Sequence, residues 1–271
     1  MDMGAILDLS GLESNLEQVE KILVDNLPAS PALRRPADRM IRGGKRLRPI
    51  LLIASAPAGR QSNETLLQLA AAVELVHQSS LVHDDIMDGS KLRRDQPTVF
   101  AAEGLDIAIL VGDYLLAKGL QLASASSPRQ ADLLSEAVAE MCEGQAMEFS
   151  DSYHRDPLDK YYIKTVVRKA GALLKAACMM GGAAGGLSIR QVSALGRFGE
   201  NFGVTFQIID DLLDKDVELS SGNVAVCRRY AKAAQSALQD SGAGNKQLLT
   251  LANLPARYLD AALPDQTAKV L

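Results

Sequence analysis

The 271-residue sequence has no tryptophan, only five phenylalanines, and aromatic residues at 4% overall. Leucine and alanine are abundant instead, with 40 and 38 copies. These two residues are strong helix formers, whereas aromatic and β-branched residues favour strands. The composition therefore predicts an all-α fold.

Cysteine, excess charge and long apolar runs are also scarce. Three cysteines without a Cys-x-x-Cys pair indicate neither a disulfide framework nor a zinc site. A net charge of −4 disfavours a protein that neutralises nucleic-acid phosphates. Residues 1–12 lack the features of a signal peptide, and no run of 18 apolar residues predicts a transmembrane segment. We therefore expect a cytoplasmic protein without a nucleic-acid partner.

Apolar residues recur at helical spacing along most of the chain. Asn63, Ser127-Pro128 and Asp156-Pro157 are typical of helix starts, and the glycine-rich stretch GGAAGG after Met180 is typical of a helix end. We expect helices over 12–27, 63–88, 104–124, 128–151, 157–180, 188–214, 223–240 and 246–263. Without an internal repeat or a linker-like tract, residues 1–271 are predicted to form a single all-α domain.

Two Asp-Asp-x-x-Asp clusters stand in otherwise apolar helical sequence. The first comprises Asp84, Asp85 and Asp88, and the second comprises Asp210, Asp211 and Asp214. At 100° per residue, His77 shares one stripe of a helix with the first and last aspartates of the first cluster. Gln207 lies one turn before the second cluster.

Carboxylates packed this way need compensation, because like charges destabilise a helix and apolar neighbours remove hydration. A single cluster is more often a solvated face with arginine partners. Two clusters in apolar helices favour a hard divalent cation. Mg²⁺ prefers a few carboxylates together with water and substrate phosphates, so the pair of clusters suits a metal-bridged diphosphate.

Two basic segments complement the acidic clusters. RGGKRLRP at 42–49 combines cations with a glycine pair that lets the backbone wrap a phosphate, and KLRRDQPT at 91–98 follows the first acidic cluster. A basic cluster alone usually means a solvated face. Separate acidic and basic sets instead suit two diphosphate substrates that are bound differently. Although a lone histidine is more often a core residue, the position of His77 favours contact with a ligand.

In this order, GGKRLRP, HDDxxD, RR and QIIDDLLD resemble the trans-polyprenyl diphosphate synthases. GDYLLAKG at 112–119, EGQAMEF at 143–149 and RKAGALLKAA at 168–177 extend the resemblance over about residues 15–215. It implies the isoprenoid synthase fold, a bundle of long helices around a central apolar cavity. It also implies a homodimer that uses Mg²⁺ to condense isopentenyl diphosphate with an allylic diphosphate into a longer trans-polyprenyl diphosphate.

The resemblance assigns a role to each matching residue. Isopentenyl diphosphate would be bound by Lys45, Arg48, His77 and Arg94, and the allylic diphosphate by Arg93 and Lys169 with Gln207 nearby. The metal would be held by Asp84, Asp88, Asp210 and Asp214, with Asp85, Asp211 and Gln145 in support. Lys164-Thr165 also looks like the Lys-Thr pair of the family, but the sequence that follows favours Lys169.

Small residues before the first acidic cluster bear on product length. In the family, aromatic side chains at the positions of Ser79 and Ser80 stop the growth of short products. The two serines therefore imply a product of C20 or longer, unless Val76 or Leu116 closes the tunnel further down.

The largest departure from the family follows Asp214. A glycine- and lysine-bearing loop and a further helix are replaced by a short connection, so the region after 214 is shortened. In addition, Ala170 stands for the usual threonine and Asp95 for the usual glycine. Because the absent loop contacts the allylic diphosphate in the family, we expect weak affinity for that substrate.

Two other functions compete with chain elongation. One is prenyl transfer to a non-isoprenoid acceptor, which the residues expected to bind isopentenyl diphosphate argue against. The other is a non-catalytic partner subunit of a hetero-oligomeric synthase. Such subunits tend to lose the aspartates, and this chain keeps all six.

Overall fold

The computed structural model describes residues 11–214, 216–217, 220–243 and 246–262. Most of these residues lie in helices, which confirms the predicted all-α fold. The helices are α1 (Glu13–Asp25), α2 (Pro31–Ile41), α3 (Leu47–Ser55), α4 (Glu64–Met87), α5 (Val99–Glu103), α6 (Leu105–Ser126), α7 (Pro128–Glu148), α8 (Lys160–Val166), α9 (Ala172–Ala184), α10 (Ile189–Leu213), α11 (Ser221–Ser241) and α12 (Lys246–Ala262). That they form one domain over residues 1–271 stays a prediction.

Most of the expected helix boundaries are confirmed to within three residues. The Asn63 side chain accepts a hydrogen bond from the Thr65 amide at the start of α4. Ser127 caps α7, and Ser188 and Gln191 form a reciprocal capping box on α10. These side chains satisfy amide groups that the first helical turn leaves without partners.

The prediction for 157–180 was wrong in three respects. The helix begins only at Lys160, after Asp159 caps it. It contains a π turn at Val167–Gly171, and it continues past Met180 to Ala184. The glycines expected to end it instead allow close packing, since a Cβ on Gly181 would lie 2.0 Å from the Leu52 carbonyl oxygen of α3. Close helix contact, rather than helix termination, accounts for Gly181.

One small strand pair was not expected. β1 (Leu92–Arg93) and β2 (Gln96–Pro97) are antiparallel, with Arg93 opposite Gln96. The two residues between them, Arg94 and Asp95, both have positive φ. This tight hairpin follows α4 directly, and it directs Arg93 and Arg94 back along that helix.

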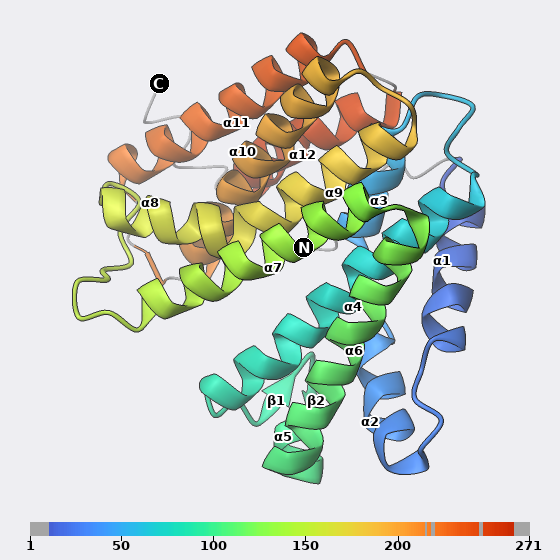
Figure 1. Cartoon of the computed structure of the whole chain (residues 1–271). Helices are drawn as coiled ribbons and strands as arrows, with labels where there is room; N and C mark the ends of the chain where they lie inside the picture. Colours follow the sequence, from blue (N-terminus) through green and yellow to red (C-terminus); the bar gives the residue numbers. More distant parts are fainter. Residues whose placement is uncertain (1–10, 215, 218–219, 244–245, 263–271) are drawn as a thin grey trace.

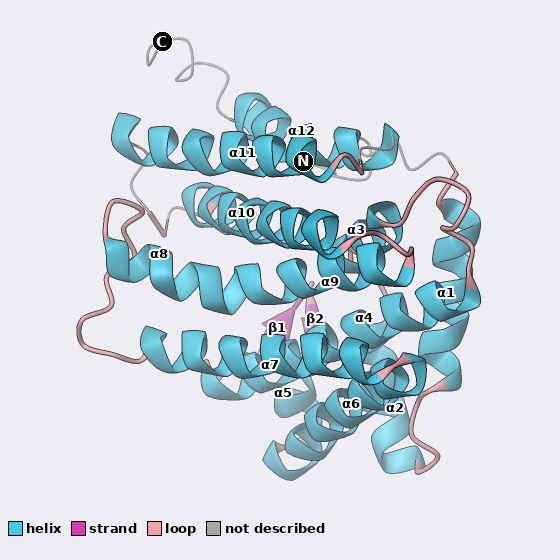
Figure 2. Ribbon diagram, turned by 45° about the horizontal axis from the view of Figure 1, so that its top comes forward, coloured by secondary structure: helices cyan, strands magenta, loops and turns pink. Residues whose placement is uncertain are grey.

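The helices pack in layers around α4. Figure 2 shows α11, α10, α9 and α7 as successive layers. Figure 1 shows α4 and α6 side by side across this stack, with α1 and α2 beside them.

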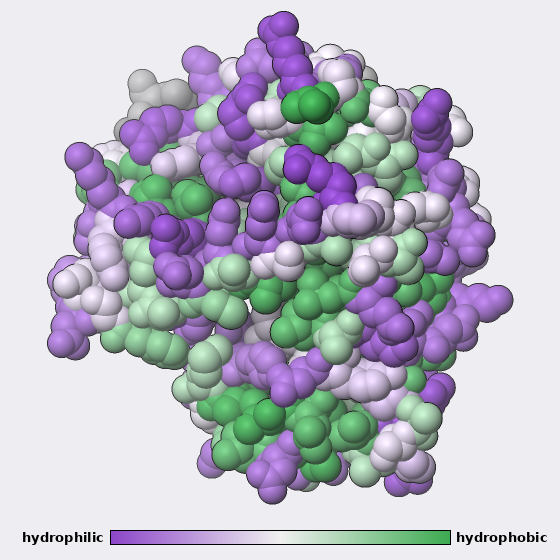
Figure 3. All heavy atoms as spheres, viewed as in Figure 1, coloured by the Kyte–Doolittle hydropathy of each residue, from purple (hydrophilic) through white to green (hydrophobic). Residues whose placement is uncertain are grey.

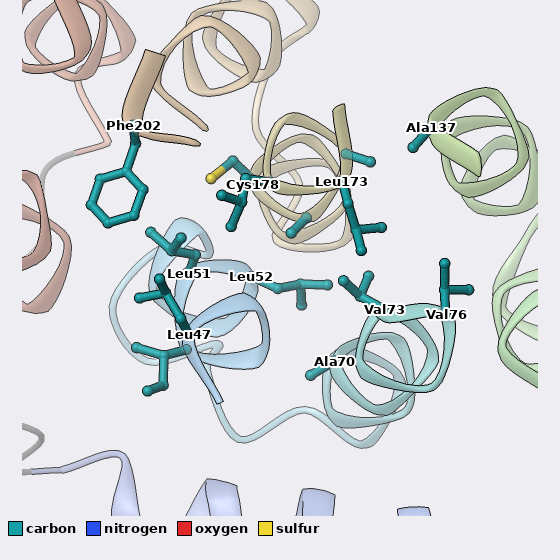
Figure 4. Packing of buried hydrophobic residues seen from close by; sticks show 14 of the residues in the cluster. Leu47, Leu51, Leu52, Ala70, Val73, Val76, Ala137, Leu173, Cys178 and Phe202 are labelled. Atoms are coloured by element: carbon teal, nitrogen blue, oxygen red, sulfur yellow. The ribbon is translucent and has the colours of Figure 1, made fainter. Parts of the chain in front are cut away.

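The buried apolar residues of these layers form one continuous cluster. Figure 4 shows Leu173 of α9 pointing towards Val73 and Val76 of α4, with Ala137 of α7 beside them. Each of these four side chains is almost fully buried. Close packing of this kind fixes the spacing of α4, α7 and α9, which enclose the cavity described below.

Helix α6 is long and apolar enough to cross a membrane, judged by length and composition alone. Only 33% of its most apolar 18-residue window is buried within the chain. Leu105, Ile109 and Leu110 are exposed on it, and Figure 3 shows an apolar patch over α5 and α6. The expectation that no segment spans a membrane stays a prediction.

Candidate active site

One cavity of about 750 Å³ contains most of the residues singled out from the sequence. Its walls come from α3, α4, α6, α7, α9 and α10, with the π turn and the hairpin at its mouth. The predicted residues on the wall are Lys45, Arg48, His77, Ser79, Ser80, Asp84, Arg93, Arg94, Gln145, Lys169, Gln207 and Asp210. Asp85, Asp88, Asp211 and Asp214 are not among the lining residues.

The first acidic cluster divides its three carboxylates among different surroundings. Asp84 faces the cavity. Asp85 is buried and accepts hydrogen bonds from Arg93, whose Nε lies 2.9 Å away and whose Nη2 lies 2.8 Å away. Asp88 is the exposed C-terminal cap of α4. Helix α4 thus sends one carboxylate into the cavity and uses the next to hold a cation at its rim.

The second acidic cluster repeats this division on α10. Asp210 lines the cavity, whereas Asp214 is exposed where the helix ends. Asp211 is buried and accepts hydrogen bonds from the Tyr162 hydroxyl at 2.5 Å and from Gln207 Nε2 at 2.9 Å. The roles of Asp88 and Asp214 as metal ligands stay predictions.

Asp84 and Asp210, the two wall carboxylates from the acidic clusters, have raised pKa values. Burial raises the pKa of Asp84, and Asp88 adds to the rise while Lys169 opposes it. Burial raises the pKa of Asp210 to about 6, with further contributions from Asp214 and Asp211 that Lys45 opposes. A bound cation would relieve this cost, so the residues fit a divalent metal.

No three potential ligands among the described histidine, cysteine and carboxylate side chains are grouped to hold a metal by themselves. Mg²⁺ commonly takes few protein ligands and shares the rest of its coordination with water and substrate phosphates. The acidic wall is therefore suited to a metal that arrives with a diphosphate.

The basic side of the cavity contains unsatisfied donors. Arg48 Nη1 lies 3.0 Å from His77 Nε2, while the buried Arg48 Nε has no hydrogen-bond partner among the described residues. Burial lowers the pKa of His77 well below its usual value, and the charge of Arg48 lowers it further. A neutral His77 can accept one hydrogen bond from Arg48 Nη1. The Arg48 Nε–H then remains available to donate to a phosphate oxygen.

Arg94, in the turn of the hairpin, completes the basic side of the cavity. Its Nη1 donates to the Arg42 carbonyl oxygen at 3.4 Å, and a Cβ on Gly44 would lie 3.0 Å from its Nη2. Gly43 and Gly44 both have positive φ. The glycine pair therefore lets the loop and the guanidinium lie against each other, in addition to leaving backbone free for a phosphate.

Lys169 lies on the π turn and lines the cavity, whereas Lys164 is exposed and is not a lining residue. The position of Lys169 agrees with the preference for it over Lys164. Its Nζ forms an ion pair with Glu148 at the end of α7. A Cβ on Gly144 would lie 2.5 Å from the Lys169 backbone nitrogen, so the π turn packs tightly against α7. π turns recur at functional sites, where they redirect a side chain.

Sequence reasoning missed several residues that hold the site. Glu148 binds Lys169, Tyr162 binds Asp211, and Arg155 pairs with both Glu148 and Asp216. Glu148 stands within the EGQAMEF segment, which is a signal that could have identified it. Asp211 lies 49 residues after Tyr162 and Asp216 lies 61 residues after Arg155, so spacing along the sequence could not predict these two pairs.

Known proteins share this sequence and architecture. The family model for polyprenyl synthetase matches residues 30–221. Component 2 of heptaprenyl diphosphate synthase from Bacillus subtilis is 32% identical over 216 residues, which cover 79% of this chain and 62% of that protein. Nonaprenyl diphosphate synthase from Mycobacterium tuberculosis is 32% identical over 223 residues, covering 80% and 66% of the two chains. The chain spans about half to two thirds of the length of such curated relatives.

A solved structure is similar in architecture as well. The polyprenyl synthase from Caulobacter crescentus, complexed with calcium and isoprenyl diphosphate, superposes with a TM-score of 0.71 at 26% identity. The superposition covers 99% of this chain and 89% of that one. The likeness therefore extends over the whole bundle.

The raised pKa of Asp210 predicts a pH-dependent cost in the metal-free protein. The folded state binds the Asp210 proton more tightly than the unfolded state does. Ionisation of this carboxyl group therefore lowers the free energy of unfolding above about pH 6. The effect vanishes below the ordinary pKa of 3.8. Asp210→Asn should therefore raise the free energy of unfolding at pH 7 by on the order of 2 kcal/mol and leave it unchanged near pH 4.

Denaturant unfolding in EDTA at both pH values measures this difference. Asp132→Asn, which removes an exposed carboxylate on α7, is the control and should have little effect at either pH. A stabilisation by Asp210→Asn that is equal at pH 4 and pH 7 would show that ionisation is not its cause.

Proposed function

Because this chain belongs to the polyprenyl synthetase family, we propose that it condenses isopentenyl diphosphate with an allylic diphosphate to give a trans-polyprenyl diphosphate of C20 or longer. The observation that carries the proposal is the division of a single cavity. Carboxylates and cations line part of its wall, and apolar side chains such as Val76, Leu116 and Val138 line the rest. A diphosphate attached to a long hydrocarbon chain matches this division.

The two charged sides suit two different anions. On one side, Asp84, Asp210 and Lys169 would receive the allylic diphosphate together with its metal, with Arg93 at the rim. On the other, Lys45, Arg48, His77 and Arg94 would bind isopentenyl diphosphate directly. Gln145 and Gln207 also line the cavity, and the Gln145 Oε1 is buried without a partner among the described residues.

In the proposed reaction, the C–O bond of the allylic diphosphate breaks and the isopentenyl double bond forms a new C–C bond at that carbon. The product then loses a proton, which the released diphosphate accepts. The cations of the mouth stabilise the departing diphosphate, and the apolar walls keep water from the electron-poor carbon. Bound Mg²⁺ would supply additional charge neutralisation to the leaving group.

Two alternatives remain open for the function. Prenyl transfer to another acceptor would leave the basic side of the cavity without a substrate. A role in a hetero-oligomer is suggested by the name of one relative, component 2 of heptaprenyl diphosphate synthase. Condensation by the purified chain alone would exclude both. A cytoplasmic location stays an expectation of the sequence.

The apolar patch on α6 supports a homodimer as part of the proposal. Leu105, Ile109 and Leu110 are 47%, 41% and 51% exposed on one helix. A second copy would cover this face with the same face of its own, as two-fold interfaces do.

The proposed roles of Asp84 and Asp210 lead to the first prediction about the activity. Asp84→Ala and Asp210→Ala should each lower turnover by at least about 10²-fold, the scale for losing one preorganised electrostatic contact. Asp132→Ala is the control, and Asp88→Ala and Asp214→Ala should have smaller effects because these side chains do not line the cavity. Incorporation of labelled isopentenyl diphosphate measures turnover. Full turnover in excess EDTA would contradict the role of the metal.

The apolar depth of the cavity generates the second prediction. Ser79→Phe and Ser80→Phe should shorten the main product while the first condensation proceeds, because both serines line the wall beside the growing chain. Leu116→Ala, which removes bulk deeper in the cavity, should lengthen the product. Chromatography of the dephosphorylated products measures chain length. Identical products from all three variants would show that the tunnel ends elsewhere.

The third prediction concerns the α6 patch. Leu110→Glu should halve the mass measured by sedimentation equilibrium, because a charge would have to be buried in the dimer interface. Leu249→Glu on α12 changes a leucine of similar exposure and should leave the mass unchanged. A dimer that persists in Leu110→Glu would assign the interface to another surface.

A further inference from the structure

A buried ion-pair network lies at the turn that joins Lys45 to the start of α3, where Arg48 lies. Its centre is Arg46, which is only 7% exposed. The Arg46 guanidinium reaches Glu74 of α4 at 2.7 Å through Nη1 and Glu20 of α1 at 3.0 Å through Nη2. It also donates to the Ile41 carbonyl oxygen at the end of α2. One side chain thereby joins three helices to the loop.

The backbone at Arg46 is in an unfavourable conformation. Its φ of 48° and ψ of 30° lie in the left-handed region, which residues with a Cβ rarely adopt. Such conformations persist where surrounding contacts over-determine them. Here the surrounding contacts are the two carboxylates and the carbonyl oxygen, so the network is what holds the turn.

This turn lies between two residues of the cavity wall. Lys45 precedes Arg46, and Arg48 follows it after the buried Leu47. Arg48 in turn contacts His77, one turn of α4 beyond Glu74. The turn and the first residues of α3 are therefore attached to α4 twice, through Arg46 to Glu74 and through Arg48 to His77.

Glu74 is itself fixed and faces the same cavity. Its side chain is 3% exposed, and it accepts a second hydrogen bond from Gln78 Nε2 at 2.7 Å. A carboxylate on the wall of a diphosphate site would repel the substrate if it acted only through its charge. Its retention beside Arg46 is explained when its role is to hold the loop.

We propose that Glu74, Arg46 and Glu20 form a positioning network that sets Lys45 and Arg48 in place to bind isopentenyl diphosphate. The inference rests on the proposed function and adds three residues that do not themselves bind substrate. It assigns the network to one of the two substrates, because the cations that face the allylic diphosphate come from the hairpin and the π turn.

The direction in which the KM for isopentenyl diphosphate changes distinguishes this proposal from a purely electrostatic effect of Glu74. Glu74→Gln keeps an oxygen that can accept from Gln78 but removes the charge that holds Arg46. Loss of repulsion alone would lower KM for isopentenyl diphosphate. Loss of positioning should raise that KM by about tenfold, because small misplacements of binding groups are costly.

The experiment measures KM for each substrate at saturating concentrations of the other, in the full chain with Mg²⁺. Glu74→Gln should raise KM for isopentenyl diphosphate and leave KM for the allylic diphosphate unchanged. Glu20→Gln should act in the same direction but more weakly, because Glu20 is half exposed. Asp38→Asn is the matched control: it breaks the exposed ion pair with Arg42 at 2.7 Å beside the same loop and should change neither KM.

A second variant guards against misfolding caused by an unpaired buried charge. The double variant Arg46→Met with Glu74→Gln removes both charges, and it should retain its melting temperature better than Glu74→Gln while still showing the raised KM. A lowered or unchanged KM for isopentenyl diphosphate in folded Glu74→Gln, or an equal rise for both substrates, would overturn the inference.

Failure of the proposed function would be distinguishable from failure of the network. If the wild-type protein condenses the two substrates but Glu74→Gln has an unchanged KM, only the inference fails. If the wild-type protein does not condense them, calorimetric titration with isopentenyl diphosphate replaces the kinetics. The network then predicts a Kd raised by about tenfold in Glu74→Gln, and an unchanged Kd refutes it.

Discussion

The close packing of α4 against α6 is the contact on which the site depends. Helix α4 supplies His77, both serines of the cavity wall and Asp84. Gly119 of α6 makes the contact possible, since a Cβ there would lie 2.7 Å from the Ala72 carbonyl oxygen. At the other end, the His83 ring occupies the space above Gly112, and its Nε2 lies 3.4 Å from Asp113. Small residues on α6 thus fix the axial position of α4.

The charged residues of the site form two groups along α4. Glu74 and His77 contact Arg46 and Arg48, while Asp84, nearer the C-terminal end of α4, lines the cavity, as does Asp210 of α10. Each charge at the mouth that is not available to substrate has a protein partner, as in Asp85 with Arg93. Burying a polyanion's head group above an apolar chamber requires this separation, because unpaired charges in such a place would be costly.

Sequence reasoning could predict what depends on periodicity and local chemistry. The long helices and several of their caps follow from apolar spacing and short motifs, whereas Lys169 was singled out only through the family resemblance. It could not predict that Gly181 continues a helix, because that depends on Leu52 of another helix. It could not separate Asp84 from Asp88 either, since one shared helical stripe does not reveal where α4 ends.

The most direct test of this account is whether one chain binds both diphosphates at once. Calorimetric titration with isopentenyl diphosphate should be done before and after saturation with an unreactive thio-analogue of the allylic diphosphate. Two anion sites predict one equivalent of each ligand per chain without competition. Removal of Mg²⁺ should abolish binding of the analogue and leave isopentenyl diphosphate bound. Displacement of one ligand by the other would contradict the division of the cavity.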